Sequence, residues 1–242
     1  MEAACQPKPS PEHPVAAPIR PLMADPACLE RSQLYSEELG IDLSGHADEQ
    51  YFRWFLASLL FGGHIGETIA RRTYLAFRRH RLTTPRRILA AGWDFLVNPI
   101  MREGGYVRYD FSKSEQILRD CQKLVDEYDG SLWQLHQVAR DAHDLEARLL
   151  AFYGVGPVTA NIFLRELRPF WPKSDSAPLP VVAAIAARLG VDLASYGRKT
   201  IIFARVEAGL IRLRHQLRRD PWQEPSRARH QRGARTPVQA AP

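Results

Sequence analysis

The chain has 242 residues, of which 45% are hydrophobic and 25% charged, an ordinary balance for a globular protein. Its apolar runs are far shorter than the roughly 20 residues that a membrane-spanning helix needs, so we expect no membrane association. The three cysteines lack metal-ligand spacing, and they are too few for an iron–sulfur cluster held by four thiolates. We therefore expect free thiols, an intracellular location, no metal and no cofactor.

Charge is unevenly distributed along the chain. From Arg198 to Pro242 there are eleven Lys and Arg against three acids, a net charge of +8, whereas the whole chain carries +6. The basic excess therefore lies in the C-terminal fifth, and this asymmetry suggests a polyanionic partner. A solvated tail without any partner would have the same composition, so charge alone leaves both interpretations open.

The two ends of the chain differ from its middle. Residues 1–28 contain seven of the eighteen prolines and no apolar periodicity, which predicts a disordered leader. Residues 221–242 contain four prolines among arginines and small residues, which predicts a disordered basic tail. We therefore expect one ordered domain over residues 29–220.

Within this domain the apolar residues recur with helical spacing, and no alternating strand pattern is present, which predicts an all-α fold. Thr84 before Pro85 predicts a helix start, because Thr caps and Pro favours the first turn, and Asp129-Gly130 predicts a helix end. Loops are expected at 102–105 and 169–180. Helices are expected at 49–61, 65–79, 84–92, 94–100, 112–128, 132–138, 144–152, 158–167, 181–189 and 200–219.

The segment richest in chemical information is a glycine turn between two of these helices. Gly154 and Gly156 bracket the apolar Val155, and the next helix begins at once. Glycine permits positive φ and a close approach of the backbone to a ligand, and the free N–H groups of a helix start suit a phosphate oxygen. We expect Val155 to point back and lock the two helices together. A plain helix–helix turn would have the same pattern.

A longer match surrounds these glycines. Residues 149–164, LLAFYGVGPVTANIFL, resemble the hairpin of the helix-hairpin-helix DNA glycosylase superfamily (HhH-GPD), which includes endonuclease III and the alkyl-purine glycosylases. Residues 55–61 are similar to the first core helix of that family, 111–118 to its Ser-Lys-Ala helix start, and 188–190 to the end of its post-hairpin helix. The resemblance covers about residues 48–190, with the hairpin at 144–168.

The resemblance implies a two-lobed helical fold that holds double-stranded DNA between the lobes and flips a damaged base out of the stack. It also implies an Asp after the hairpin, which stabilises the positive charge that develops on the sugar as the glycosidic bond breaks. Arg205, Arg212 and Arg219 recur at intervals of seven, so this helix face could follow a phosphate backbone. The expected DNA-binding residues are Gly154, Val155, Gly156, Val158, Thr159, His64, Lys113 and Arg212.

Two positions depart from the family pattern. Bifunctional members carry Lys two residues after the second hairpin glycine, where this chain has Val158, so a Schiff-base lyase step by that route is not expected. Asp175 is the only carboxylate in the loop 168–180 and is the predicted catalytic residue, although counting back from Arg188 puts the catalytic position at Leu179.

These features predict a monomeric, monofunctional N-glycosylase of base-excision repair. We expect it in the cytoplasm with the nucleoid, or in the nucleus of a eukaryote. A catalytically inactive, lesion-sensing DNA-binding module is the alternative. A helical interaction protein without a nucleic-acid partner is a third alternative.

Other candidates have structural explanations as well. His64 could fill the gap left by a flipped base, or be a surface histidine. Trp93, Tyr106, Tyr109 and Trp171 could stack on a base, but each is more typical of packing. Asp141, His143 and Asp144 could suggest a metal site, but a helix start explains them better.

Overall fold

The computed structural model describes residues 25–217, and this part of the chain contains helices and no β-strand, which confirms the all-α prediction. None of the helices described is both long enough and apolar enough to cross a membrane. In chain order the helices are α1 (Pro26–Glu30), α2 (Tyr35–Glu38), α3 (Asp48–Phe61), α4 (Glu67–Arg79), α5 (Pro85–Phe95), η2 (Leu96–Met101), α6 (Arg102–Gly104), α7 (Asp110–Tyr128), α8 (Leu132–Val138), α9 (Ala142–Leu150), α10 (Pro157–Leu167), α11 (Pro180–Leu189), η3 (Leu193–Ser195) and α12 (Ile201–Leu217).

Several helix boundaries follow from capping residues that the sequence predicted. The Thr84 side chain accepts the N–H of Arg87 at the start of α5, and Pro85 occupies its first turn. Gly92, with φ 76°, interrupts the regular helix near the predicted end. At the end of α7, Asp129 and Gly130 both have left-handed backbone angles, and the Gly130 N–H returns to the carbonyl of Leu124.

Helices form in two segments that were expected to be a leader and a loop. Helix α1 begins at Pro26, within the expected leader, because Asp25 caps it and Leu29 is buried against α12. Helix α6 forms where a loop was expected at 102–105. Gly104 lies so close to α4 that a Cβ there would be 2.0 Å from Oγ1 of Thr73, so this glycine serves packing rather than a loop. The predicted tail, 221–242, lies outside the described residues.

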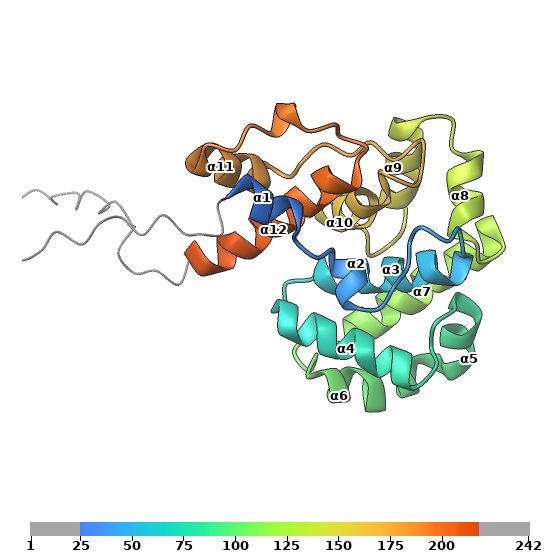
Figure 1. The fold of residues 1–242 in the computed structure, drawn as a ribbon. Helices are drawn as coiled ribbons and strands as arrows, with labels where there is room; N and C mark the ends of the chain where they lie inside the picture. Colours follow the sequence, from blue (N-terminus) through green and yellow to red (C-terminus); the bar gives the residue numbers. More distant parts are fainter. Residues whose placement is uncertain (1–24, 218–242) are drawn as a thin grey trace, which may run out of the picture.

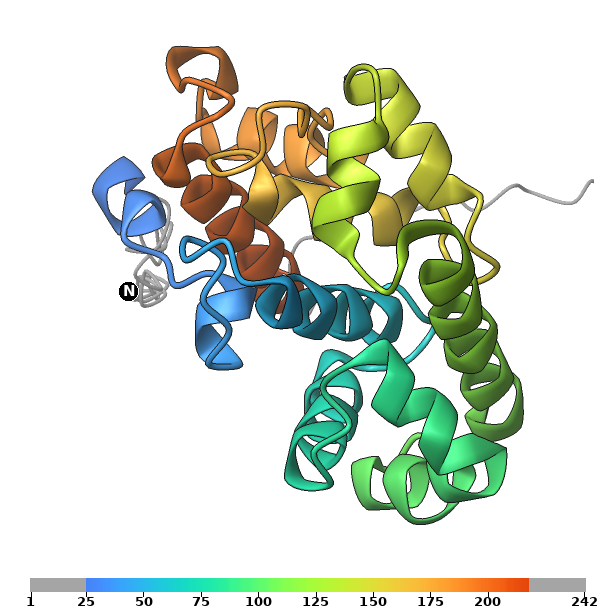
Figure 2. The same cartoon turned by 90° about the vertical axis from the view of Figure 1, so that its right-hand side faces the viewer.

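Helix α3 is the centre of the molecule, and nine of its fourteen residues are buried. Helices α4 to α6 lie on one side of it, and α8 to α12 with α1 lie on the other (Figure 1). The turned view shows the long helix α7 running beside both groups (Figure 2). One large core cluster contains side chains of α3, α4, α7 and α10. A smaller cluster joins α1, α11 and α12.

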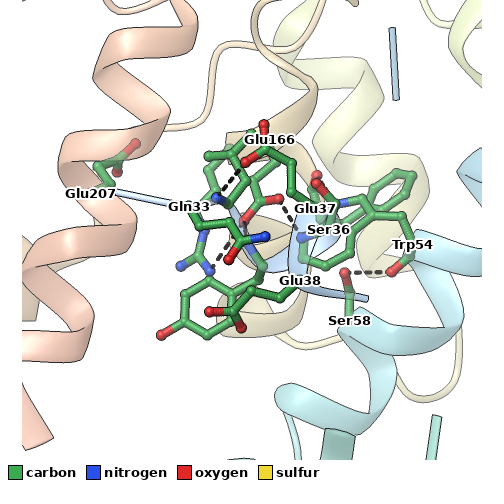
Figure 3. Close-up of polar contacts among 12 residues, drawn as sticks. Gln33, Ser36, Glu37, Glu38, Trp54, Ser58, Glu166 and Glu207 are labelled. Carbon is green, nitrogen blue, oxygen red and sulfur yellow. Dashed lines mark hydrogen bonds and ion pairs between the residues drawn. The ribbon is translucent and has the colours of Figure 1, made fainter. Parts of the chain in front are cut away.

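Buried charges connect the N-terminal segment to this core. The Glu166 carboxylate of α10 accepts the backbone N–H groups of Tyr35 and Ser36, at 3.0 and 2.9 Å, and thereby caps α2 (Figure 3). Burial raises the pKa of Glu166 above its ordinary value. Arg168, next to the end of α10, forms a fully buried ion pair with Glu207 of α12. These contacts fix the outer end of α10, whose other end forms the candidate site.

Candidate nucleic-acid interface

The turn between α9 and α10, residues 151–156, projects an exposed tip from a buried base. Val155 is only 6% exposed and belongs to the large core cluster, so it locks the two helices together as predicted. Tyr153 and Val158 are 63% and 50% exposed, although both are large hydrophobic residues. The tip therefore presents apolar side chains and backbone to the solvent.

The two glycines of this hairpin have different roles. A Cβ on Gly154 would lie 2.3 Å from Cγ and Cδ of Gln116, so this glycine is required for close packing on α7. Gly156 has φ −90° and ψ 176°, and a Cβ there would meet no atom within 4 Å. Gly156 therefore does not use the positive φ that glycine permits, because the chain enters α10 through extended backbone that any residue can adopt.

Helix α10 begins with unsatisfied donors. Pro157 has no N–H, and the first hydrogen bond into the helix joins the N–H of Ala160 to the carbonyl of Gly156 at 2.9 Å. Within residues 25–217 the N–H groups of Val158 and Thr159 have no hydrogen-bond acceptor. The Thr159 side chain is itself buried, because it packs against Gly62 at the end of α3. Thr159 as a whole is only 4% exposed, whereas Val158 is 50% exposed, so Val158 is the accessible residue at this helix start.

An open cavity of about 510 Å³ lies beside the hairpin and is called the hairpin cavity below. It combines the end of α3, the loop before α7, the first turns of α7 and the hairpin. The cavity unites His64 and Lys113, which the sequence analysis predicted to contact DNA, with the hairpin tip. Its lining residues are Gly63, His64, Tyr106, Tyr109, Ser112, Lys113, Glu115, Gln116 and Tyr153.

Lys113 lies in the wall of this cavity but is not a free cation. Its ammonium group donates to the carbonyl of Leu59 at 3.1 Å and to the side-chain oxygen of Gln116. Burial lowers the pKa of Lys113 to about 8. Lys113 therefore joins α7 to the end of α3, and the predicted direct phosphate contact would require it to leave both partners.

Asp120 is a residue of this region that the sequence analysis missed. It is 1% exposed, and its Oδ1 accepts the N–H of Gly154 at 3.3 Å. Its Oδ2 is buried without a hydrogen-bond partner among the described residues. Burial raises the pKa of Asp120 to about 7. A signal was present in the sequence, because Asp120 lies on the same helical face as Ile117 and Leu124, where an unpaired carboxylate is unusual.

Asp175 lies away from the hairpin cavity. Its carboxylate pairs with Arg198 at 3.2 Å, and its carbonyl accepts from the same guanidinium at 2.8 Å. Asp175 does not line the cavity, whereas the predicted catalytic role requires access to the sugar of a bound nucleotide. Leu179 immediately precedes α11 and forms no side-chain capping bond. The position that counting back from Arg188 gave for the expected catalytic carboxylate therefore holds an aliphatic side chain.

The arginines predicted to follow a phosphate backbone are also engaged elsewhere. Arg212 pairs with Glu38 at 2.8 Å, donates to the carbonyl of Gln33 and lies 4.4 Å from the centre of the Tyr35 ring. Arg205 pairs with Glu37 at 2.5 Å. Both arginines join α12 to residues 33–38 of the chain, and Arg212 does not line the hairpin cavity. Arg219 lies outside the described residues.

The remaining candidates divide between core and surface. Trp171 and Tyr106 are buried, which supports packing as their main role, whereas Tyr109 is 38% exposed at the cavity. Trp93 is exposed and contacts Phe111, with ring centroids 5.2 Å apart. The acidic cluster at 141–144 is a helix start, because Asp141 caps α9 by accepting the N–H of Asp144.

Comparison with known proteins provides no function to transfer. None of the protein-family models, curated proteins or solved structures that were compared matches the chain. The function must therefore be inferred from the geometry of the hairpin and its cavity.

Proposed function

We propose that this protein binds double-stranded DNA through the α9–α10 hairpin and accommodates an extruded nucleoside in the hairpin cavity, as a lesion-recognising component of base-excision repair. The observation that carries the proposal is the start of α10. There, the exposed Val158 has a backbone N–H without an acceptor among residues 25–217, and the same turn contributes Tyr153 to the lining of a cavity that also contains other tyrosine side chains and a histidine. Free N–H groups at a helix start bind phosphate oxygens, and aromatic rings stack on unpaired bases.

The helix arrangement supports the two-lobed interpretation of this proposal. Helices α4 to α6 and helices α8 to α12 lie on opposite sides of α3 (Figure 1). The hairpin cavity takes residues from the end of α3, from the loop that precedes α7 and from the hairpin. A duplex phosphate on α10 would therefore lie beside a space that an extruded nucleotide could enter.

A binding titration tests the hairpin. Gly156→Val adds a branched side chain where a phosphate would approach, and the protein itself leaves room for it, so we expect the variant to fold. Its affinity for a duplex containing an abasic site should fall at least tenfold, which corresponds to about 1.4 kcal/mol. Gly45→Val is the matched control, because Gly45 lies before the start of α3 and the hairpin cavity lies at the end of α3. The fourteen residues of α3 separate the two places by about 21 Å. Fluorescence anisotropy measures both variants. Unchanged affinity in folded Gly156→Val would exclude the hairpin as the DNA contact.

Recognition without cleavage is the form of this function that the geometry favours. Leu179 occupies the position that counting back from Arg188 gave for the carboxylate, Val158 occupies the Schiff-base position, and Asp175 pairs with Arg198 outside the cavity. The N-glycosylase remains the second candidate, because Asp175 is the only carboxylate of the 168–180 loop. Hydrolysis would require this loop to move so that Asp175 reached the sugar.

Base release from duplexes that carry a panel of damaged bases separates the two candidates. We expect binding without base release. Release that Asp175→Asn abolishes, while DNA affinity is retained, would instead establish the glycosylase and assign Asp175 as its catalytic carboxylate. Release that survives Asp175→Asn would contradict both the non-hydrolytic function and the assignment.

A further inference from the structure

A row of polar side chains on α7 faces the hairpin. Lys113, Gln116 and Asp120 are three and four residues apart, so they share one helical face. Lys113 binds the end of α3 and the amide oxygen of Gln116. Gln116 packs against Gly154, and Asp120 accepts the Gly154 N–H. This row, called the polar row below, connects the end of α3 to the hairpin.

Asp120 is the member of the polar row that places an ionisable carboxyl group in a buried position. One carboxylate oxygen accepts the Gly154 N–H at 3.3 Å, and the other is buried without a partner among the described residues. An amide of the same shape would occupy this place without the cost of burying a charge. The backbone bond therefore provides a reason for a carboxylate here, because an ionised acceptor binds an N–H about twice as strongly as a neutral one.

The charges around Asp120 are few and known. Burial raises its pKa to about 7, while the N–H groups of Gly154 and Tyr153 and the ammonium groups of Lys113 and Lys123 act in the opposite direction. The buried thiol of Cys121 adjoins it, and its pKa lies well above the ordinary value, so this thiol stays neutral near pH 7. Near neutral pH, the hydrogen bond to the Gly154 N–H is therefore altered by the ionisation of Asp120 and not by that of Cys121.

We propose that Asp120 is a positioning residue of the hairpin: its ionised carboxylate holds the Gly154 N–H and sets the turn in the geometry that binds a DNA phosphate. Protonation weakens this bond, loosens the turn and lowers the affinity for DNA. The inference rests on the proposed DNA-binding function of the hairpin. Asp120 itself does not line the hairpin cavity, so it acts through the backbone of Gly154 rather than by touching DNA.

The test compares the pH dependence of DNA binding in the full chain and in Asp120→Asn. Between pH 7.5 and 5.5 we expect the affinity of the wild-type protein for an abasic-site duplex to fall roughly fivefold to tenfold, about the difference between a hydrogen bond to a charged acceptor and one to a neutral acceptor. Asp120→Asn should bind about tenfold more weakly than the wild-type protein at pH 7.5 and vary little with pH. This range lies below the pKa of Lys113, about 8, so that group stays mainly charged.

A control variant separates the contact from general electrostatics. Asp126→Asn removes the same charge from an exposed position on the same helix and should follow the wild-type profile. Loss of pH dependence in both aspartate variants would attribute the effect to net charge and overturn the proposal.

Amide hydrogen exchange of the DNA-free protein gives a readout that needs no variant. After correction for intrinsic exchange, the Gly154 N–H should be less protected at pH 5.5 than at pH 7.5. A wild-type affinity independent of pH, an Asp120→Asn variant that keeps the wild-type profile, or equal Gly154 protection at both pH values would each overturn the role of Asp120. If the wild-type protein binds no DNA at all, the proposed function fails, and exchange alone reports whether Asp120 controls the turn.

Discussion

At the scale of single residues, the important feature is that Asp120 is buried at a cost to stability. Its folded-state pKa of about 7 lies above the ordinary 3.8, so the folded protein binds the proton more tightly than the unfolded chain. The stabilising contribution of the protonated group is therefore complete below about pH 4 and is lost as the pH rises through 7. At slightly alkaline pH, folding must tolerate a buried carboxylate.

This linkage predicts that Asp120→Asn stabilises the protein at high pH. The gain should approach an upper limit of about 4 kcal/mol near pH 8, since each pKa unit corresponds to about 1.4 kcal/mol, and it should shrink towards pH 4. Urea unfolding at several pH values measures it, with Asp126→Asn as the exposed control. Equal stabilities of the variant and wild-type proteins at pH 8 and pH 5 would mean that Asp120 carries no such cost. Higher stability with weaker DNA binding would be a trade-off between stability and function.

At the scale of secondary-structure elements, the hairpin depends on close contact between its turn and α7. Gly154 touches Gln116, and Val155 enters the core, whereas Gly156 and Val158 face outward. The turn therefore has a packing side and an exposed side within three residues. Substitutions on the two sides should change different properties.

Alanine at each glycine separates these properties. Gly154→Ala should destabilise the fold by about 1–3 kcal/mol, because its Cβ would overlap Gln116 in a packed contact. Gly156→Ala should change stability by less than about 0.5 kcal/mol, since the space there is open. Thermal and urea unfolding measure both. Combining Gly154→Ala with Gln116→Ala should recover part of the loss, and equal stabilities of the two single variants would refute this division of roles.

At the scale of the whole molecule, the described arginines that were expected to follow a phosphate backbone do not belong to the candidate surface. Arg205 and Arg212 of α12 are paired with Glu37 and Glu38, so they strengthen the attachment of the N-terminal segment. The basic residues beyond them include Arg227, Arg229, Arg232 and Arg235, in the segment 221–242 outside the described residues. This segment contains four arginines and one acid, Glu224, so we expect it to contribute to any attraction between the chain and DNA that depends on charge.

Deletion of residues 221–242 tests that contribution. We expect the truncated chain to fold, because both core clusters consist of residues between 29 and 213. Its DNA affinity should fall, and the slope of log affinity against log salt should decrease by about 0.9 for each phosphate that the deleted segment neutralises. A salt titration of the full and truncated chains measures this. Identical slopes would show that the tail binds no phosphates.

The sequence by itself determined the helical class, most helix boundaries and the glycine turn between α9 and α10. These features depend on local rules: apolar spacing of three and four residues, Thr84 with Pro85 at a helix start, and glycines at a turn. Local rules also predicted that Val155 locks the hairpin. They failed at Gly104, because the residue type alone does not distinguish a glycine needed for close packing from a glycine in a loop. They also did not show that Gly156 has extended backbone rather than the positive φ that glycine permits.

Only the tertiary structure decided which charged groups belong to the candidate site. Asp175 meets Arg198 and Arg212 meets Glu38, and the latter two residues are 174 positions apart, so no local pattern could reveal that pair. Asp120 contacts Gly154 across 34 positions and joined the site unpredicted. A charge acquires its partner and its pKa from the elements that fold around it, whereas a helix acquires its boundaries from neighbours along the chain.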